Sequence, residues 1–259
     1  MQTIDLNCDL GESFGNYKCG MDEEILPYIT SANVACGFHA SDPLVMQKTV
    51  RLAKENQVHI GAHPGFQDLV GFGRRNMSLP AEEITAIVVY QIGALHAFCA
   101  ANDVTLQHVK PHGALYNMAV KDSAIADAIC EGIAAVNPSL ILLGPAKSQL
   151  VFSAKKYGLR AAREVFADRA YEEDGSLVAR SKPGAVISNR EEALARVIQM
   201  VKYGTVTAIT GREIEVEADS VCIHGDNPAA LAFAKSIRDA LKAEGITPMP
   251  MDDVIACVK

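Results

Sequence analysis

The chain has 259 residues, of which 49% are hydrophobic and 21% are charged, and its formal net charge is −7 with a pI of about 5.5. This composition is that of a globular protein and excludes a disordered chain. Nucleic-acid binding needs a concentrated basic face, and no run of Lys or Arg supplies one. We therefore expect a protein that binds no nucleic acid and that folds around a sizeable core without disulfides.

The cysteines and the apolar segments restrict the cellular setting. The seven cysteines are odd in number and form no CxxC pair, so we expect buried free thiols in a reducing compartment. The N-terminal segment lacks the pattern of a signal peptide. Gln91, Gly93 and His96 interrupt the most apolar stretch, residues 84–101, which predicts a buried helix. We expect a cytoplasmic protein without a membrane span.

Short apolar or alternating runs recur along the chain, with helix-like segments between them. This alternation is typical of repeated βα units, which build a parallel sheet. The expected strands are residues 3–10, 32–38, 59–64, 105–111, 140–144, 159–167 and 220–224. The expected helices are residues 22–29, 42–56, 80–101, 122–136, 147–157, 190–203 and 227–244. No glycine- or proline-rich linker divides the chain, so we expect one domain over residues 1–259.

Polar residues fall in one alternating phase near the C-terminal ends of most predicted strands. In the first strand Asp5, Asn7 and Asp9 alternate with apolar residues, which puts the three on one face. The same phase continues in His39, His59, His63, His108, Lys110, His112, Glu164, Asp168, His224 and Asp226. In a closed barrel such faces converge on the axis and on the rim where active sites lie. The pattern favours a barrel, although periodicity alone also allows an open doubly wound sheet.

The densest feature is the segment His108-Val-Lys110-Pro-His112, with three ionisable side chains on one strand face. Such groups are costly in a core unless they are paired or solvated, and perturbed titratable groups cluster at functional sites. His and Asp side chains from several strand ends can hold a divalent metal or act as a metal-free acid–base set. The sequence does not decide between a metal site and a metal-free acid–base set. The candidate metal ligands are Asp9, His39, His63 and His224.

Two loops carry candidate groups for an anionic substrate. Residues 65–75 end in Arg74 and Arg75, and paired arginines suit bidentate binding of a carboxylate, although a solvated surface loop has the same composition. A second long loop, residues 168–180, begins with Asp168 and Arg169, and long loops are often lids or binding loops. The chain has no GxxxxGK(S/T) and no GxGxxG after a strand. Any use of ATP would therefore depend on a partner.

Several long motifs together resemble the LamB/YcsF family. They are NCDLGESFG at residues 7–15, HPGFQDLVGFGRR at 63–75, VKPHGALYN at 109–117 and ADRAY at 167–171, with NVACGFH at 33–39 and HGD at 224–226. The resemblance implies a seven-stranded (β/α) TIM-like barrel, similar to the glycoside hydrolase/deacetylase superfamily. It also implies a hydrolase that cleaves the lactam bond of 5-oxo-L-proline to give L-glutamate with hydrolysis of ATP. The expected partners are B and C subunits that bind the ATP.

Residue types and strand-end positions suggest roles for that reaction. We expect Asp9 or Glu12 as general base, His63 or His112 as acid, and Lys110 as the stabiliser of oxyanion or phosphate charge. The expected substrate-binding residues are Asn7, His39, Arg74, Arg75, Asp168, Arg169, His224 and Asp226. Two alternatives stay open: a self-sufficient metal-dependent amidohydrolase or deacetylase, and a non-catalytic protein that binds the substrate for its partners.

Overall fold

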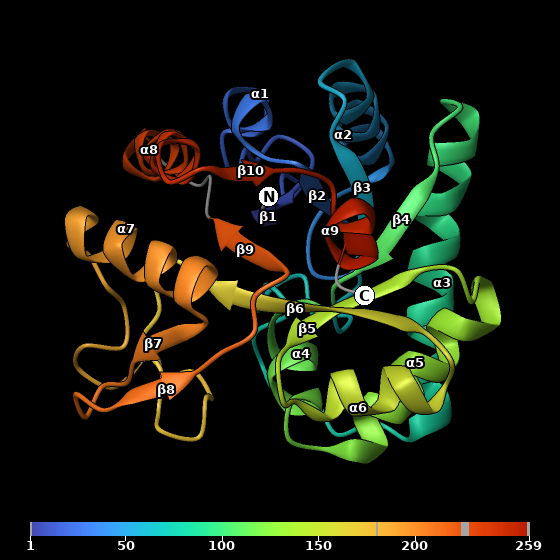
Figure 1. The fold of residues 1–259 in the computed structure, drawn as a ribbon. Helices are drawn as coiled ribbons and strands as arrows, with labels where there is room; N and C mark the ends of the chain where they lie inside the picture. Colours follow the sequence, from blue (N-terminus) through green and yellow to red (C-terminus); the bar gives the residue numbers. More distant parts are fainter. Residues whose placement is uncertain (1, 180, 224–227, 258–259) are drawn as a thin grey trace.

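The computed structural model describes residues 2–179, 181–223 and 228–257, and it shows a ring of parallel strands surrounded by helices (Figure 1). The strands are β1 (Gln2–Leu10), β2 (Ser31–Ala35), β3 (His59–His63), β4 (Leu106–Val109), β5 (Ile141–Pro145), β6 (Arg160–Phe166) and β9 (Ser220–Ile223). Each strand pairs in parallel with the next, and β9 pairs with both β6 and β1. The seven strands therefore close a barrel, which confirms the predicted fold and excludes the open sheet.

The helices that follow the strands cover the outside of the ring. They are α1 (Asp22–Ile25) with η1 (Leu26–Tyr28), α2 (Pro43–Glu55), α3 (Ala81–Ala101), α5 (Ser123–Val136), α6 (Gln149–Lys156), α7 (Arg190–Ile198) with η2 (Gln199–Tyr203), and α8 (Pro228–Ala243). All correspond to predicted helices. Asp42 shows why α2 begins where it does, since its carboxylate accepts the backbone N–H groups of Leu44 and Val45 at 2.9 and 3.0 Å.

Several short elements were not expected from the sequence. They are α4 (Gly113–Ala119), the hairpin of β7 (Thr205–Thr207) and β8 (Glu213–Glu215), β10 (Ile246–Pro248) and α9 (Met251–Cys257). β10 pairs with the first residues of β1, and Met251 of α9 packs against Ile141 and Leu143 of β5. None of these elements exceeds seven residues. Periodicity over so few residues carries little signal.

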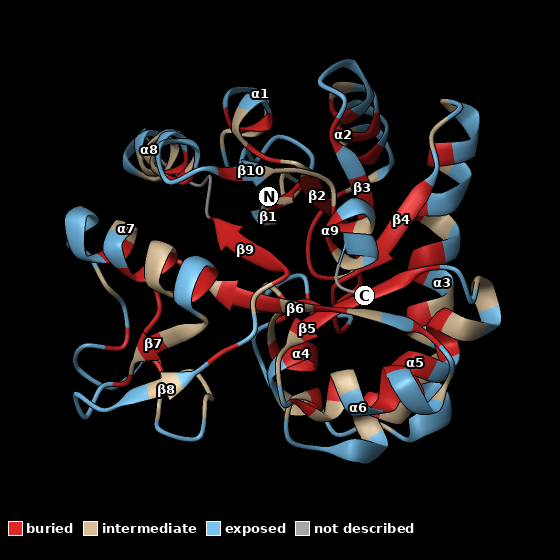
Figure 2. Ribbon diagram, viewed as in Figure 1, coloured by how far each residue is buried: buried red, intermediate tan, exposed pale blue. Residues whose placement is uncertain are grey.

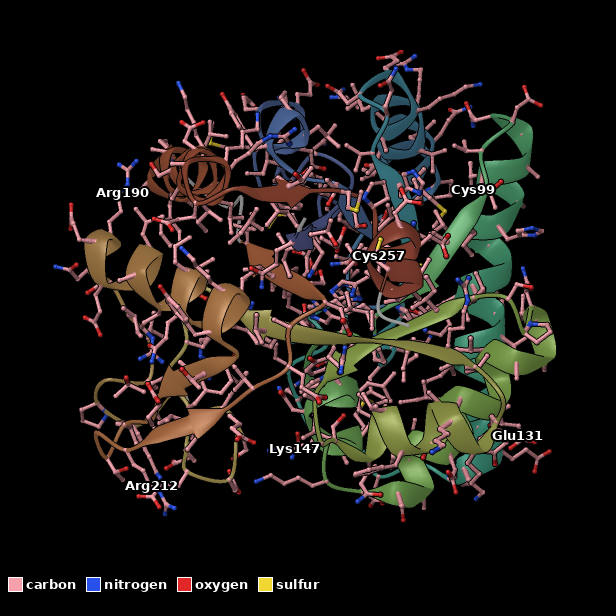
Figure 3. All side chains as sticks on the ribbon, viewed as in Figure 1. Cys99, Glu131, Lys147, Arg190, Arg212 and Cys257 are labelled. Atoms are coloured by element: carbon pink, nitrogen blue, oxygen red, sulfur yellow. The ribbon has the colours of Figure 1, made fainter. Side chains whose placement is uncertain are left out.

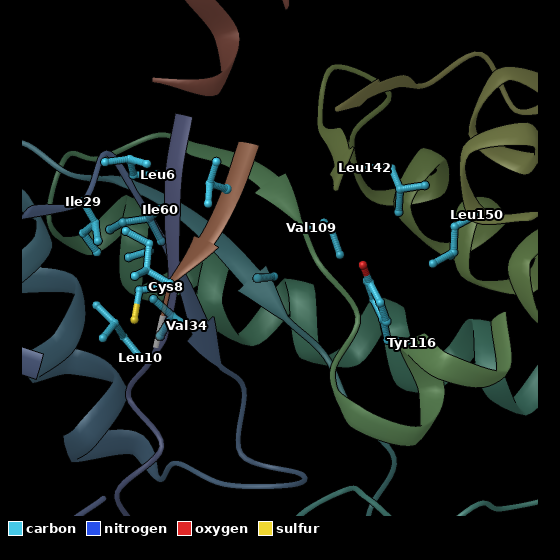
Figure 4. Packing of buried hydrophobic residues seen from close by; sticks show 14 of the residues in the cluster. Leu6, Cys8, Leu10, Ile29, Val34, Ile60, Val109, Tyr116, Leu142 and Leu150 are labelled. Atoms are coloured by element: carbon cyan, nitrogen blue, oxygen red, sulfur yellow. The ribbon is translucent and has the colours of Figure 1, made fainter. Parts of the chain in front are cut away.

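The alternation along the strands separates an apolar outer layer from a polar barrel interior. Leu6, Leu10 and Ile60 belong to the main hydrophobic cluster (Figure 4). Asp5 and Asn7, on the other face of β1, are fully buried as well, and the strands are buried along most of their length (Figure 2). Branched apolar side chains usually fill the interior of such barrels. Here polar side chains occupy part of that space.

Helix α3 is long and apolar enough to cross a membrane, judged by length and composition alone. In the structure it is one of the helices around the barrel, with Val88 and Leu95 buried. The Gln91 side chain bonds the backbone N–H and C=O of Gly65 at 3.0 and 2.9 Å, which ties α3 to the loop after β3. The prediction of a buried helix holds for the inner face only, because Tyr90 on the outer face is 65% exposed.

The seven cysteines all lie within the described residues, and no disulfide joins any two of them. Five are buried as predicted, namely Cys8, Cys36, Cys99, Cys130 and Cys222. The prediction is wrong for Cys19 and Cys257, which are exposed; Figure 3 shows Cys257 on α9 and Cys99 on α3.

Gly61 of β3 leaves the space that the ring of His108 on β4 occupies. A Cβ atom at Gly61 would lie 2.1 Å from Nε2 of His108. We expect Gly61→Ala to lower the free energy of unfolding by about 1–3 kcal/mol, because the ring must move. Gly93→Ala on the exposed face of α3 is the matched control: a Cβ there meets nothing within 4 Å, and alanine should stabilise the helix by about 0.5–1 kcal/mol. Urea denaturation measures both, and a Gly61→Ala variant as stable as the wild type would contradict this packing.

Candidate active site

The side chains capable of chemistry gather at the C-terminal ends of the strands. Asp9 lies near the end of β1, His63 ends β3, and Glu164 lies on β6. The loops after β1, β2 and β4 add Glu12, His39, Lys110 and His112. The side chains of Asp9 and Glu12 are 24% and 16% exposed, whereas the others are buried. The cluster therefore meets solvent beside these two carboxylates.

Lys110 places a buried positive charge inside the rim. Its Nζ lies 2.7 Å from Oε1 of Glu164 and 3.1 Å from Oδ1 of Asp9, and it donates to Oδ1 of Asn7 at 3.1 Å. Burial by itself disfavours the ammonium, but Asp9, Cys222 and Glu164 outweigh it and raise the pKa of Lys110 well above its ordinary value. Lys110 is therefore a fixed cation that can stabilise negative charge developing beside Asp9.

Glu164 and Tyr116 lie outside the predicted site, although both belong to this charge network. The Tyr116 hydroxyl donates to Oε2 of Glu164 at 2.6 Å, while Oε1 faces Lys110. Glu164 falls in the predicted polar phase of its strand, so the alternation could have identified it. The alternation along the strands could not have identified Tyr116, because this residue lies on α4, a helix too short for its periodicity to be recognised.

Three histidines form a compact cluster. The rings of His39 and His112 stack with centroids 3.6 Å apart and an interplanar angle of 2°, and His63 meets His112 edge-on. Nδ1 of His63 donates to the backbone carbonyl of Lys110 at 2.7 Å, and Nε2 of His112 donates to that of Phe72 at 2.9 Å. As a result Nε2 of His63 and Nδ1 of His112 face each other at 2.9 Å.

The loop after β3 presses against this histidine cluster. Gly73 has φ +62°, and a Cβ atom there would lie 2.7 Å from Cβ of His39 and 2.9 Å from Cδ2 of His112. The left-handed conformation and the lack of space both require glycine. The glycine-rich motif of residues 63–75 thus serves to seat the histidine pair.

Burial and charge set the protonation of these groups. Burial would raise the pKa of Asp9, but His63, 3.4 Å away, and Lys110 hold it well below its ordinary value. Burial would lower the pKa of His63, but Asp9 raises it overall. Burial and the nearby Asp9 raise the pKa of Glu12, and burial with the neighbouring histidines lowers that of His112 to about 2. Asp9 is therefore ionised and His112 neutral at pH 7.

The structure brings most of the predicted residues together. One connected cluster contains Asn7, Asp9, Glu12, His39, His63, Lys110 and His112. The two arginines differ: Nε of Arg75 donates to Oδ1 and Oδ2 of Asp68 at 2.9 and 3.1 Å, whereas Arg74 lies with its Cζ 5.2 Å from the ring centroid of Phe72.

The loop after β6 does not carry its arginine into the cluster. Arg169 is buried and donates to the backbone carbonyls of Val178 and Ala185 at 2.6 and 3.3 Å, so it braces its own loop. Asp168 precedes it, and its backbone carbonyl accepts from Ile187 at 2.8 Å. His224 and Asp226 lie outside the described residues.

A chain of amides runs from the rim down the barrel axis. The Asn33 side chain donates to Oδ1 of Asn7 and to Oδ1 of Asp9, both at 2.8 Å, and Asn7 donates to Ser220 at 2.7 Å. His108 bonds the Asn33 oxygen at 2.7 Å through Nε2. His108 therefore supports the site from below and does not reach the rim.

The closed barrel and its charged rim define a (β/α)-barrel protein with its candidate active site at the C-terminal ends of the strands, the usual position in this class. The chain belongs to the LamB/YcsF family, whose profile matches residues 4–256. The resemblance seen in the motifs is thus confirmed.

Relatives match over nearly the whole chain. The chain is 59% identical to the A subunit of 5-oxoprolinase from Clostridium beijerinckii over 254 residues, which are 98% of this chain and 100% of that protein. It is 57% identical to the A subunit of 5-oxoprolinase from Bacillus subtilis over 246 residues, 95% of this chain and 96% of that one. The crystal structure of the lactam utilization protein from Thermus thermophilus matches with a TM-score of 0.92 and 47% identity, covering 95% and 99% of the two chains.

Asp5 at the base of the barrel predicts a pH dependence of stability. It is fully buried, and burial raises its pKa from 3.8 to about 6 despite hydrogen bonds from Ser220, Ser31 and Thr30. The folded chain holds this proton more tightly than the unfolded chain, so the stabilisation present below pH 4 is lost as pH rises through 6, a change of up to about 3 kcal/mol in all. We expect Asp5→Asn to remove that fall. Urea denaturation between pH 4 and 7 tests this, and parallel pH profiles for variant and wild type would contradict it.

The ion pair of Lys110 with Glu164 predicts a charge-specific loss of stability. Lys110→Met leaves the Glu164 carboxylate buried without a cation, and we expect the free energy of unfolding to fall by about 3–5 kcal/mol. Lys110→Met with Glu164→Gln removes both charges and should recover more than half of that loss. Urea denaturation at pH 7 measures the difference. Equal losses in the single and double variants would show that the pair is not what stabilises the barrel here.

Proposed function

We propose that this chain is the A subunit of an ATP-dependent 5-oxoprolinase and that its barrel opens the lactam ring of 5-oxo-L-proline to give L-glutamate. The observation that supports this most is the fixed Lys110 cation beside the Asp9–His63 pair at the solvent side of the rim. Water bound there would meet a base and a positive charge together, and hydrolysis of an amide needs both. We take the identity of the substrate from the near full-length relatives, which are named as A subunits of 5-oxoprolinase.

The chemistry requires activation before water attacks. An unstrained amide is a poor electrophile, so we assign to B and C subunits the binding of ATP and the transfer of its γ-phosphoryl group to the lactam oxygen. Water then adds to the activated carbon, and the ring C–N bond breaks as its nitrogen gains a proton, which leaves an acyl phosphate of the opened chain. A second water hydrolyses that acyl phosphate to glutamate and phosphate. One ATP and two waters are consumed for each glutamate, with ADP and phosphate as the other products.

The rim offers a group for each of these steps. Asp9 or Glu12 serves as general base, since these two carboxylates reach solvent, and His63 or His112 supplies the proton to the nitrogen. Lys110 stabilises the charge on the oxygen or its phosphate. For the substrate carboxylate Arg74 is a better candidate than Arg75, because Asp68 already occupies the guanidinium of Arg75.

Glutamate release from 5-oxoproline and ATP tests the proposal. We expect release only when the chain is combined with B and C subunits and ATP is present. In that complex Lys110→Met with Glu164→Gln should lower kcat by at least about 100-fold, since the charge that stabilises the transition state is gone. His96→Gln, an exposed histidine on α3, is the matched control and should leave the rate unchanged.

Two results would contradict the proposal in different ways. Hydrolysis of an amide by the isolated chain without ATP would identify a self-sufficient amidohydrolase or deacetylase. Full activity of the complex carrying the double variant, with the variant shown to be folded by circular dichroism, would identify a non-catalytic binding protein.

A further inference from the structure

Four potential ligands converge at the solvent side of the histidine cluster. Glu12, His39, His63 and His112 each offer one nitrogen or oxygen atom, and these atoms lie within 4.8 Å of one another. They come from the ends of four adjacent strands, β1 to β4. This set shares His39 and His63 with the one predicted from the sequence, adds Glu12 and His112 and omits Asp9, while the fourth predicted ligand, His224, lies outside the described residues.

The hydrogen bonds of two histidines leave their lone pairs facing each other. Nδ1 of His63 and Nε2 of His112 must both carry hydrogen, because each contacts a backbone carbonyl, at 2.7 and 2.9 Å. In the neutral rings Nε2 of His63 and Nδ1 of His112 are then both unprotonated, 2.9 Å apart. Two lone pairs at that distance repel, so either a proton or a metal cation lies between them. Donation of the far N–H to a carbonyl is also the usual second contact of a metal-ligating histidine.

Glu12 completes the set with negative charge. Its Oε1 lies 3.6 Å from Nδ1 of His112 and 3.3 Å from Nε2 of His39. Zinc bonds of 2.0–2.1 Å in a tetrahedron separate neighbouring ligand atoms by about 3.3 Å, and the distances of 2.9 and 3.6 Å lie on either side of that value. His39 stacks parallel to His112, so its lone pairs do not converge with those of His112.

We infer that Glu12, His63 and His112 bind one divalent transition-metal ion, zinc or an ion of similar preference, and that His39 orients the Glu12 carboxylate. Two imidazoles and one carboxylate are a set found at catalytic zinc, with a fourth position for water. Magnesium and calcium prefer all-oxygen sites and are not expected to bind here.

This inference extends the proposed function by adding an ion to the same site. Asp9, whose Oδ2 lies 3.4 Å from Nε2 of His63, borders the position left for water. The proposed function assigns proton transfer to Asp9, Glu12, His63 and His112. If the last three bind the ion, Asp9 is the group that can still accept a proton. The ion would supply the polarisation of that water.

Metal binding by the purified chain tests the inference without any turnover. The chain is stripped with a chelator and titrated with Zn²⁺ by calorimetry and with Co²⁺ by visible absorption. We expect one ion per chain, a Co²⁺ spectrum of a four- or five-coordinate nitrogen and oxygen site, and a rise in Tm of roughly 5–10 °C at a hundredfold excess over Kd. Glu12→Gln and His112→Gln should weaken binding at least 100-fold, while His96→Gln should bind as the wild type does.

Several outcomes would overturn the inference. They are no stoichiometric binding, equal binding by His112→Gln and His96→Gln, or full glutamate release by a complex built from stripped chain with Mg²⁺ as its sole divalent ion. The last result would be compatible with the proposed function. It would mean that a proton, and not a metal ion, lies between His63 and His112. Conversely, one tightly bound ion in a chain whose complex releases no glutamate would leave the metal site standing and refute the proposed function.

Discussion

A lysine ammonium with almost no contact with solvent holds the upper part of this barrel together. Closing seven strands into a ring turns one face of each strand inward, and a charge placed there must find partners or the fold loses several kcal/mol. Lys110, just past β4, reaches Asp9 and Asn7 on β1 and Glu164 on β6. One side chain thus links three strands, and the positions of the other polar groups follow from it.

The groups around Lys110 fall into two sets, one buried and one in contact with solvent. Glu164 and Tyr116 are buried, and the Tyr116 hydroxyl donates to one oxygen of Glu164 while the other oxygen faces Lys110, so both have little freedom to react. Asp9 and Glu12 reach solvent and lie against the histidines. A site of this kind holds its cation rigidly from one side and offers carboxylates to a substrate on the other. Such preorganised charge is effective in catalysis because it needs no rearrangement during the reaction.

Two glycines are as necessary to the geometry of the site as the charged residues are. Gly61 makes room for His108 inside the barrel, and Gly73 lets the loop after β3 press against His39 and His112. Neither residue can take part in chemistry. They explain why a motif such as HPGFQDLVGFGRR extends well beyond its ionisable members: the backbone must approach the imidazole rings closely for the rings to keep their orientation.

The sequence by itself determined the parallel strands and their inward faces, because alternation with a period of two is a local property that Asp5, Asn7 and Asp9 display within one strand. It also identified Asp9, His63, Lys110 and His112 as strand-end groups. Only the tertiary structure decided which groups meet. Strand register, barrel closure and side-chain direction decide that Arg75 pairs with Asp68 and that Glu164 pairs with Lys110. They also decide that Glu12, and not Asp9, joins the three histidines as a potential metal ligand. Most of these contacts join residues that are far apart in the chain, and no local pattern encodes them.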